Sequence, residues 1–153
     1  MNDLRDLYQE VILDHSKHPR NFREPEKCTR RADGHNPLCG DRLTVFLTLE
    51  DGVVKDASFQ GSGCAISTAA ASMMTETLMG KTEAEAEAIF EKYHEMLTGE
   101  SETPPDGMGK LAVFAGVREF PIRVKCATLA WHTMRAALQK AAETVTTEER
   151  SVP

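Results

Sequence analysis

The sequence lacks any apolar run long enough to cross a membrane, and its first ten residues contain no apolar stretch of the kind found in secretion signals. It also lacks an excess of positive charge, because the net charge of the 153 residues is −6 at pH 7. A protein with this charge is expected to repel nucleic acid and anionic membranes. These absences predict a cytoplasmic protein that binds neither a nucleic acid nor a membrane.

The four cysteines form no Cys-x-x-Cys pair, and no His-x-Glu sequence occurs. Zinc deaminases typically carry both features, with the glutamate as general acid and base, so a hydrolytic zinc enzyme of that class is disfavoured. In a reducing cytosol, cysteines serve more often as metal ligands or reactive thiols than as disulfide partners. The cysteines are therefore the first place to look for function.

The composition is that of one globular domain, with 41% hydrophobic and 27% charged residues. A chain of this length can bury a core without disulfides. We expect a single domain over residues 1–143, followed by a polar, flexible tail at 144–153.

Apolar periodicity and turn signals predict an α+β fold, a three-stranded antiparallel sheet with about five helices packed on it. Strands are expected at 28–33, 43–49 and 53–60, the last two joined by a hairpin turn at Asp51-Gly52. Loops are expected at 34–40 and 100–109. Helices are expected from Asp3 to just before Pro19, at 65–79, after the capping-box pair Thr82 and Glu85, at 110–117, and after Pro121.

Three cysteines lie at the ends of these predicted elements, where their side chains can converge. Cys39 precedes a strand, Cys64 precedes a helix, and Cys126 lies near the start of the last helix. A helix N-terminus favours the thiolate form of cysteine. The basic residues Arg123 and Lys125 beside Cys126 are expected to act in the same direction.

Asp41, two residues after Cys39, adds a carboxylate to this set. Three thiolates and one carboxylate form a donor set that suits zinc or an iron–sulfur cluster rather than calcium or magnesium. The separations along the chain are long and irregular. On spacing alone, a purely structural zinc site, or three buried cysteines packing as small apolar side chains, remain alternatives.

Three segments resemble, in order, the three cysteine motifs of the IscU/NifU-N family of iron–sulfur cluster assembly proteins, and most closely those of its SufU branch. They are Asn-Pro-Leu-Cys-Gly-Asp at 36–41, Gly-Ser-Gly-Cys-Ala-Ile-Ser at 61–67 and Lys-Cys-Ala-Thr-Leu-Ala-Trp at 125–131. Residues 13–15 and 19–22 are similar to the family's first helix and the loop after it, so the resemblance covers about residues 4 to 142.

The resemblance implies that Cys39, Asp41, Cys64 and Cys126 are the metal ligands. In the SufU branch the metal is Zn²⁺, and the cysteine matching Cys39 accepts persulfide sulfur from a cysteine desulfurase. The alternative is a scaffold on which a [2Fe–2S] cluster is built and passed to downstream iron–sulfur scaffold or acceptor proteins. The first reading makes the chain a zinc-dependent sulfurtransferase, and the second makes it a non-enzymatic scaffold.

One departure bears on this choice. IscU proteins of the scaffold type carry a histidine immediately before the third cysteine, where this chain has Lys125. The segment from about Glu91 to Val113 resembles the extra helix and loop of the SufU branch. Both features favour the sulfur acceptor. His35 is a candidate spare ligand, whereas Cys28 matches no family motif and is expected to lie outside the site.

Overall fold

The computed structural model describes residues 3–99, 105–139 and 145–146. Its helices are α1 (Asp3–Lys17), α2 (Ala65–Leu78), α3 (Glu83–Thr98), the 3₁₀-helix η1 (Gly109–Glu119) and α4 (Pro121–Leu138). Its strands are β1 (Arg30–Asn36), β2 (Asp41–Glu50), β3 (Val53–Ser62) and the short β4 (Val145–Thr146). The predicted α+β class, with a three-stranded antiparallel sheet and five helices, is confirmed.

The sheet has the strand order β3-β2-β1-β4, and its first three strands form an antiparallel meander. Asp51 and Gly52 both have positive φ, 54° and 76°, as a tight hairpin turn requires. β4 pairs in parallel with β1 at Gly34 and His35, so part of the predicted tail lies beside the sheet. The rest of that tail lies outside the described residues, and its flexibility stays a prediction.

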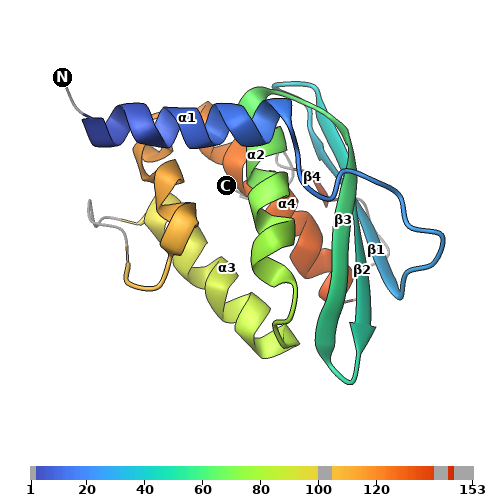
Figure 1. Cartoon of the computed structure of the whole chain (residues 1–153). Helices are drawn as coiled ribbons and strands as arrows, with labels where there is room; N and C mark the ends of the chain where they lie inside the picture. Colours follow the sequence, from blue (N-terminus) through green and yellow to red (C-terminus); the bar gives the residue numbers. More distant parts are fainter. Residues whose placement is uncertain (1–2, 100–104, 140–144, 147–153) are drawn as a thin grey trace.

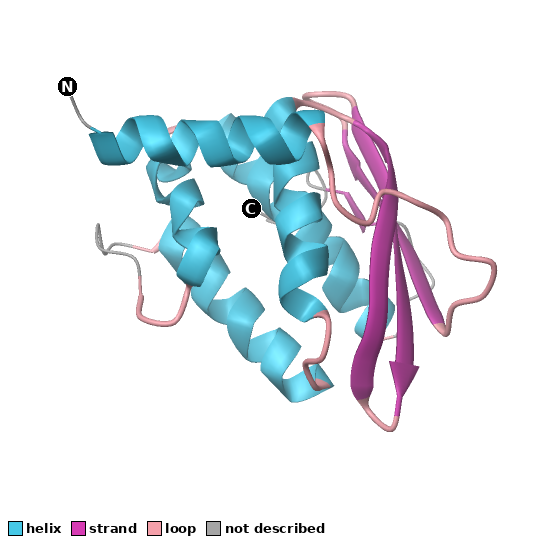
Figure 2. Ribbon diagram, viewed as in Figure 1, coloured by secondary structure: helices cyan, strands magenta, loops and turns pink. Residues whose placement is uncertain are grey.

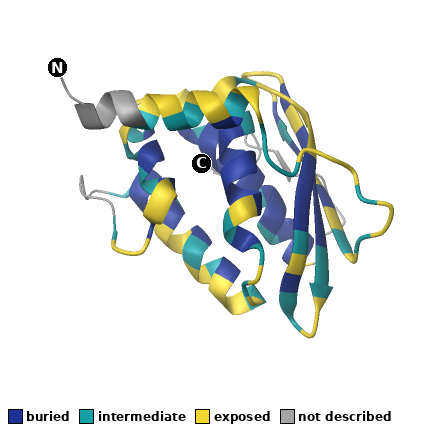
Figure 3. Cartoon of the chain, in the orientation of Figure 1, coloured by how far each residue is buried: buried dark blue, intermediate teal, exposed yellow. Residues whose placement is uncertain are grey.

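The helices cover one face of the sheet, as Figures 1 and 2 show. Alternate residues of β2, namely Leu43, Val45 and Leu47, are buried, while Arg42 is exposed. Buried faces line the space between sheet and helices in Figure 3. The largest buried side chains come from the helical layer: Phe90, Tyr93, Phe114 and Trp131. Burial of aromatic side chains of this size supplies most of the drive for helix packing.

A buried polar contact fixes α1 on α2. His15 is 3% exposed, and its Nδ1 lies 2.7 Å from the Ser72 hydroxyl oxygen, which also accepts the Arg20 backbone N–H at 2.8 Å. Burial lowers the pKa of His15, and the charge of Arg20 lowers it further. A neutral imidazole therefore joins the first helix to the helix that begins at Cys64.

Two predicted boundaries were wrong. The strand predicted at 28–33 lies at Arg30–Asn36, and the loop predicted from Gly34 is the turn at 37–40. Gly34 stays in the strand because β1 packs closely on α4 there, and a Cβ at this position would overlap Thr133. The last helix begins at Pro121, and Cys126 lies in its second turn, near the helix start as predicted. Over the described part of the chain, none of the helices combines the length and the apolarity needed to span a bilayer.

Candidate metal centre

Cys39 lies at the tip of the hairpin between β1 and β2. The Cys39 N–H donates to the Asn36 carbonyl at 3.3 Å, and the Leu38 N–H donates to the Asn36 side-chain oxygen at 3.2 Å. Gly40 closes the turn with a φ of 72°, a conformation in which a side chain would be strained. This tight turn leaves the Cys39 thiol exposed to solvent.

Asp41 is the first residue of β2 and is fully buried. Its Oδ1 accepts the Cys64 backbone N–H at 2.8 Å, which ties the start of β2 to the start of α2. A Cβ at Gly63 would lie 2.7 Å from the same oxygen, so this carboxylate and the backbone before Cys64 are in close contact. A buried carboxylate needs such partners, because the charge has lost its water.

Cys64 caps the N-terminus of α2, and its sulfur accepts the Ser67 backbone N–H at 3.4 Å. The pKa of Cys64 is lowered to about 7, mainly by a hydrogen bond from Cys126 and also by the Ser67 N–H, against the opposing effect of burial. Backbone N–H groups at a helix start stabilise a thiolate in this way.

Cys126 is the buried member of the set, with 2% of its surface exposed. Its Sγ lies 3.3 Å from the Cys39 Sγ and accepts a hydrogen bond from the Asn36 side-chain amide at 3.5 Å. The hydrogen bond to Cys64, followed by burial, raises the pKa of the Cys126 thiol. Without metal, the hydrogen bond between the two sulfurs therefore favours the thiolate form at Cys64 and the thiol form at Cys126.

The donor atoms are close enough to bind one ion. Ligand atoms of Cys39, Asp41 and Cys126 lie within 4.8 Å of one another, and the Cys64 Sγ is 3.9 Å from the Asp41 Oδ2. Zn–S bonds of about 2.3 Å in a tetrahedron place two sulfurs about 3.8 Å apart. The ligand atoms of Cys39, Asp41 and Cys126 are therefore close enough to share one metal ion, and Cys64 lies next to the Asp41 carboxylate of that set. Thiolates also bind iron–sulfur clusters.

A cavity of about 530 Å³ opens beside the thiols, and Cys39, Cys64 and Cys126 contribute to its wall. Two exposed apolar side chains, Leu13 from α1 and Ile122 from α4, line the same cavity. The site is thus a group of thiols at the edge of an apolar hollow on the protein surface.

The basic residues predicted beside Cys126 occupy different places. Arg123 lines the cavity, and its guanidinium carbon lies 4.6 Å from the centre of the Phe120 ring. Lys125 is half-buried next to Cys126. Their electrostatic support of the site stays a prediction.

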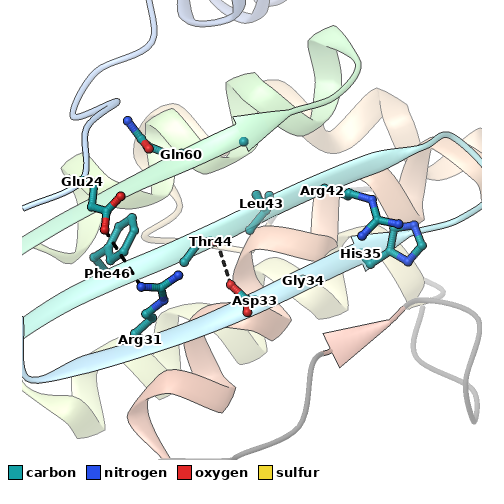
Figure 4. Close-up of a pocket in the computed structure, with 11 residues that line it drawn as sticks. Glu24, Arg31, Asp33, Gly34, His35, Arg42, Leu43, Thr44, Phe46 and Gln60 are labelled. Atoms are coloured by element: carbon teal, nitrogen blue, oxygen red, sulfur yellow. Dashed lines mark hydrogen bonds and ion pairs between the residues drawn. The ribbon is translucent and has the colours of Figure 1, made fainter.

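His35 does not point toward the cysteines. It lies on the outer face of the sheet, beside Arg42 in a separate pocket of about 410 Å³ (Figure 4). Its neighbour Asn36 is buried and contacts Cys126, because adjacent strand residues face opposite ways. Cys28 lies before the far end of β1, away from the hairpin tip that carries Cys39.

Sequence reasoning missed Asn36 as part of the site. An alternating pattern could have predicted that Asn36 points inward, because Ala32, Gly34 and Asn36 occupy every second position and all face α4. It was hidden because Gly34 and Asn36 are typical loop residues.

Comparison with known proteins identifies the family of this chain. The profile of the NifU-like N terminal domain matches residues 7–127. The chain is 38% identical over 138 residues to the zinc-dependent sulfurtransferase SufU of Bacillus subtilis (strain 168), covering 90% of this chain and 93% of that protein. It is 35% identical over 142 residues to the iron-sulfur cluster assembly scaffold protein IscU of Streptococcus pyogenes serotype M1, covering 93% and 89%.

The fold of this chain is also similar to that of a solved structure. The crystal structure of the SUF-system protein FiSufU from Fervidobacterium islandicum AW-1 superposes with a TM-score of 0.80 at 32% identity, covering 88% of this chain and 98% of that one. The residues matched by the family profile, 7–127, include all four donor residues. They also include β1, β2, α2 and the first seven residues of α4. The chain belongs to the NifU-like N-terminal domain family.

Proposed function

We propose that this chain acts in iron–sulfur cluster assembly as a zinc-bound sulfur acceptor, taking sulfane sulfur at Cys39 from a cysteine desulfurase. The observation that carries the proposal is the difference in exposure among the donors. Cys39 is exposed on a hairpin tip, Cys64 is half-buried, and Cys126 and Asp41 are buried. Cys39 is therefore the donor most accessible to a second protein, and it can leave a metal without disturbing a helix, whereas Cys64 caps α2.

The transfer is a thiolate–sulfur exchange. The Cys39 thiolate attacks the outer sulfur of a persulfide on the desulfurase. A sulfur–sulfur bond forms at Cys39 while the sulfur–sulfur bond of the partner breaks, and the partner cysteine leaves as a thiolate. The number of sulfur–sulfur bonds is unchanged, so the step needs no oxidant or reductant.

Cys39, Asp41, Cys64 and Cys126 would hold the zinc ion. A bound zinc ion keeps the thiols deprotonated at neutral pH and lowers their nucleophilicity until one of them is released. Asp41 and Cys64 hold their places through the 2.8 Å hydrogen bond between them, so the site keeps its shape while Cys39 reacts.

The second candidate is a scaffold for a [2Fe–2S] cluster that is passed to acceptor proteins. It is favoured by the same donor set and by similarity to a relative named as a scaffold. Lys125, which stands where scaffold-type IscU proteins have histidine, favours the acceptor, because the chain lacks an imidazole ligand at that position.

The test combines metal analysis with desulfurase kinetics. Protein purified without added metal should contain stoichiometric zinc, and it should raise the turnover of a cysteine desulfurase from the same genome. Cys39→Ala should abolish the stimulation, whereas Cys28→Ala, at the far end of β1, should keep it. A brown protein that contains iron and sulfide, together with an active Cys39→Ala variant, would favour the scaffold.

A further inference from the structure

The contact between Cys39 and Cys126 has a chemical consequence once Cys39 carries sulfur. We propose, building on the acceptor function above, that Cys126 is the resolving thiol of this protein. It attacks the Cys39 sulfur of the persulfide, releases the added sulfur as hydrosulfide and leaves a Cys39–Cys126 disulfide. Delivery of sulfide is then a property of the chain itself.

The geometry selects the sulfur that is attacked. The 3.3 Å separation joins the Cys126 Sγ to the Cys39 Sγ, which becomes the inner sulfur of a Cys39 persulfide. The outer sulfur is an added atom, and the cavity of about 530 Å³ beside Cys39 has room for it. Attack on the inner sulfur expels the outer one, whereas attack on the outer sulfur would only move it to Cys126.

The surroundings hold Cys126 for this attack. It is 2% exposed in the second turn of α4, and the Asn36 amide donates to its sulfur at 3.5 Å. Asn36 also accepts the Cys39 N–H through its carbonyl, so one residue contacts both cysteines. The exposed hairpin turn is the element that moves when the sulfurs close from 3.3 Å to a bond of about 2.05 Å.

Cys64 is less suited to this role. In the described part of the chain, the ligand atoms that lie within 4.8 Å of one another belong to Cys39, Asp41 and Cys126 and do not include Cys64. The Cys64 sulfur instead accepts the Ser67 N–H at the start of α2 and lies 3.9 Å from the Asp41 carboxylate. Cys64 also shares a hydrogen bond with Cys126, and it is Cys126 whose sulfur lies 3.3 Å from the Cys39 sulfur.

The step balances without an outside oxidant. The protonated Cys39 persulfide and the Cys126 thiolate give one disulfide and one hydrosulfide ion, which keeps the persulfide proton. The bond between the two persulfide sulfurs breaks and the Cys39–Cys126 bond forms. The outer sulfur is reduced to sulfide as the two cysteine sulfurs are oxidised to the disulfide. A dithiol reductant from outside the chain must then reduce this disulfide before the next cycle.

Trypsin places each cysteine on its own peptide, which makes the step directly measurable. Cleavage after lysine and arginine yields residues 28–30 with Cys28, 32–42 with Cys39, 56–81 with Cys64 and 126–135 with Cys126. The zinc-loaded protein is charged anaerobically with a cysteine desulfurase and cysteine, desalted, and sampled over time for sulfide and for alkylated peptides by mass spectrometry.

The first sample should show peptide 32–42 heavier by one sulfur atom. Later samples should show sulfide and a disulfide-linked pair of peptides 32–42 and 126–135 in equal amounts. Cys126→Ser should keep the persulfide and release sulfide at least about tenfold more slowly, because an intramolecular attack is lost. Cys28→Ser and protein incubated without cysteine serve as controls, and the latter should form no link.

The peptide map of the wild-type protein tests whether Cys126 is the resolving thiol even if the Cys126→Ser variant folds poorly. A persulfide on 32–42 that decays without a link to 126–135, or that links to 56–81, overturns the role of Cys126 and leaves the acceptor function standing. A wild-type protein that carries no persulfide in the first sample contradicts the acceptor function, and the resolving role falls with it.

Discussion

Gly63→Ala tests whether the position of Asp41 controls the metal site. A Cβ at residue 63 would lie 2.7 Å from the Asp41 Oδ1 and 3.1 Å from its Cγ, closer than real Cβ contacts allow. Asp41 is fully buried and its Oδ1 accepts the Cys64 N–H at 2.8 Å. The carboxylate must therefore shift by a few tenths of an ångström, or the Gly63–Cys64 backbone must move away from it.

The expected effect is large for one methyl group. Metal–ligand distances tolerate displacements of about 0.2 Å, which this shift exceeds. Changes in the groups that orient metal ligands typically reduce metal affinity by about 10-fold to 100-fold. Loss of a hydrogen bond to a charged group costs about 1.5 to 3 kcal/mol. Gly63→Ala should thus weaken metal binding by about that 10-fold to 100-fold range and also reduce the free energy of unfolding of the metal-free protein.

Zinc affinity is measured by competition with a chromophoric chelator, and unfolding by circular dichroism in urea. Gly116→Ala is the matched control, because residue 116 is exposed and its added Cβ meets no atom within 4 Å. If Gly63→Ala binds zinc as tightly as Gly116→Ala, Asp41 is not a ligand whose position the backbone before Cys64 controls.

Three further predictions concern stability. The pKa of His15 lies below 6.5 in the folded state, mainly because the side chain is buried and also because of the charge of Arg20. The unfolded chain therefore binds more protons than the folded chain between about pH 7 and 5. The free energy of unfolding should thus fall as the pH drops through that range. Urea titrations of wild type and His15→Gln check this, and an unchanged slope in the variant contradicts it. Gly34→Ala should cost about 1 to 3 kcal/mol, since its Cβ overlaps Thr133. Thr82→Ala removes the hydrogen bond that the Glu85 N–H donates to the Thr82 hydroxyl oxygen and should cost about 0.5 to 2 kcal/mol, and equal chemical denaturation midpoints would refute either prediction.

Local chemistry made much of the fold predictable. The capping box at Thr82 and Glu85 and the Asp51-Gly52 hairpin each depend on residues within one turn of each other, and both are present as predicted. The start of α2 after Cys64 could also be predicted, because a strand pattern, a short glycine-containing segment and an apolar helical pattern follow one another in the sequence.

Structural features that depend on contacts between residues far apart in the sequence could not be predicted from the sequence. Gly34 and Asn36 near the end of β1 have low strand propensity, and they extend the strand because they pack on α4 and pair with β2. That extension decides that Asn36 faces Cys126 while His35 faces outward. A shift of one residue in the strand would have exchanged the two side chains.

The candidate site shows the same division. Residue types and motif resemblance named Cys39, Asp41, Cys64 and Cys126 as ligands, and the fold brings their side chains together. The differences in pKa and exposure among the cysteines could be determined only from the structure. The hydrogen bond with Cys64, and then burial in α4, raises the pKa of Cys126 although basic residues flank it. The exposed turn makes Cys39 the accessible thiol.

The most direct test of the central claim is to locate sulfur after a single turnover of the partner. A cysteine desulfurase loaded with one equivalent of ³⁵S-labelled cysteine is mixed with the zinc-bound protein, and alkylation and tryptic digestion follow at once. The account predicts label on the peptide of residues 32–42, which contains Cys39, and none on the peptide of residues 28–30. Label that stays on the desulfurase, or that enters a Cys39→Ala variant to the same extent, would contradict it.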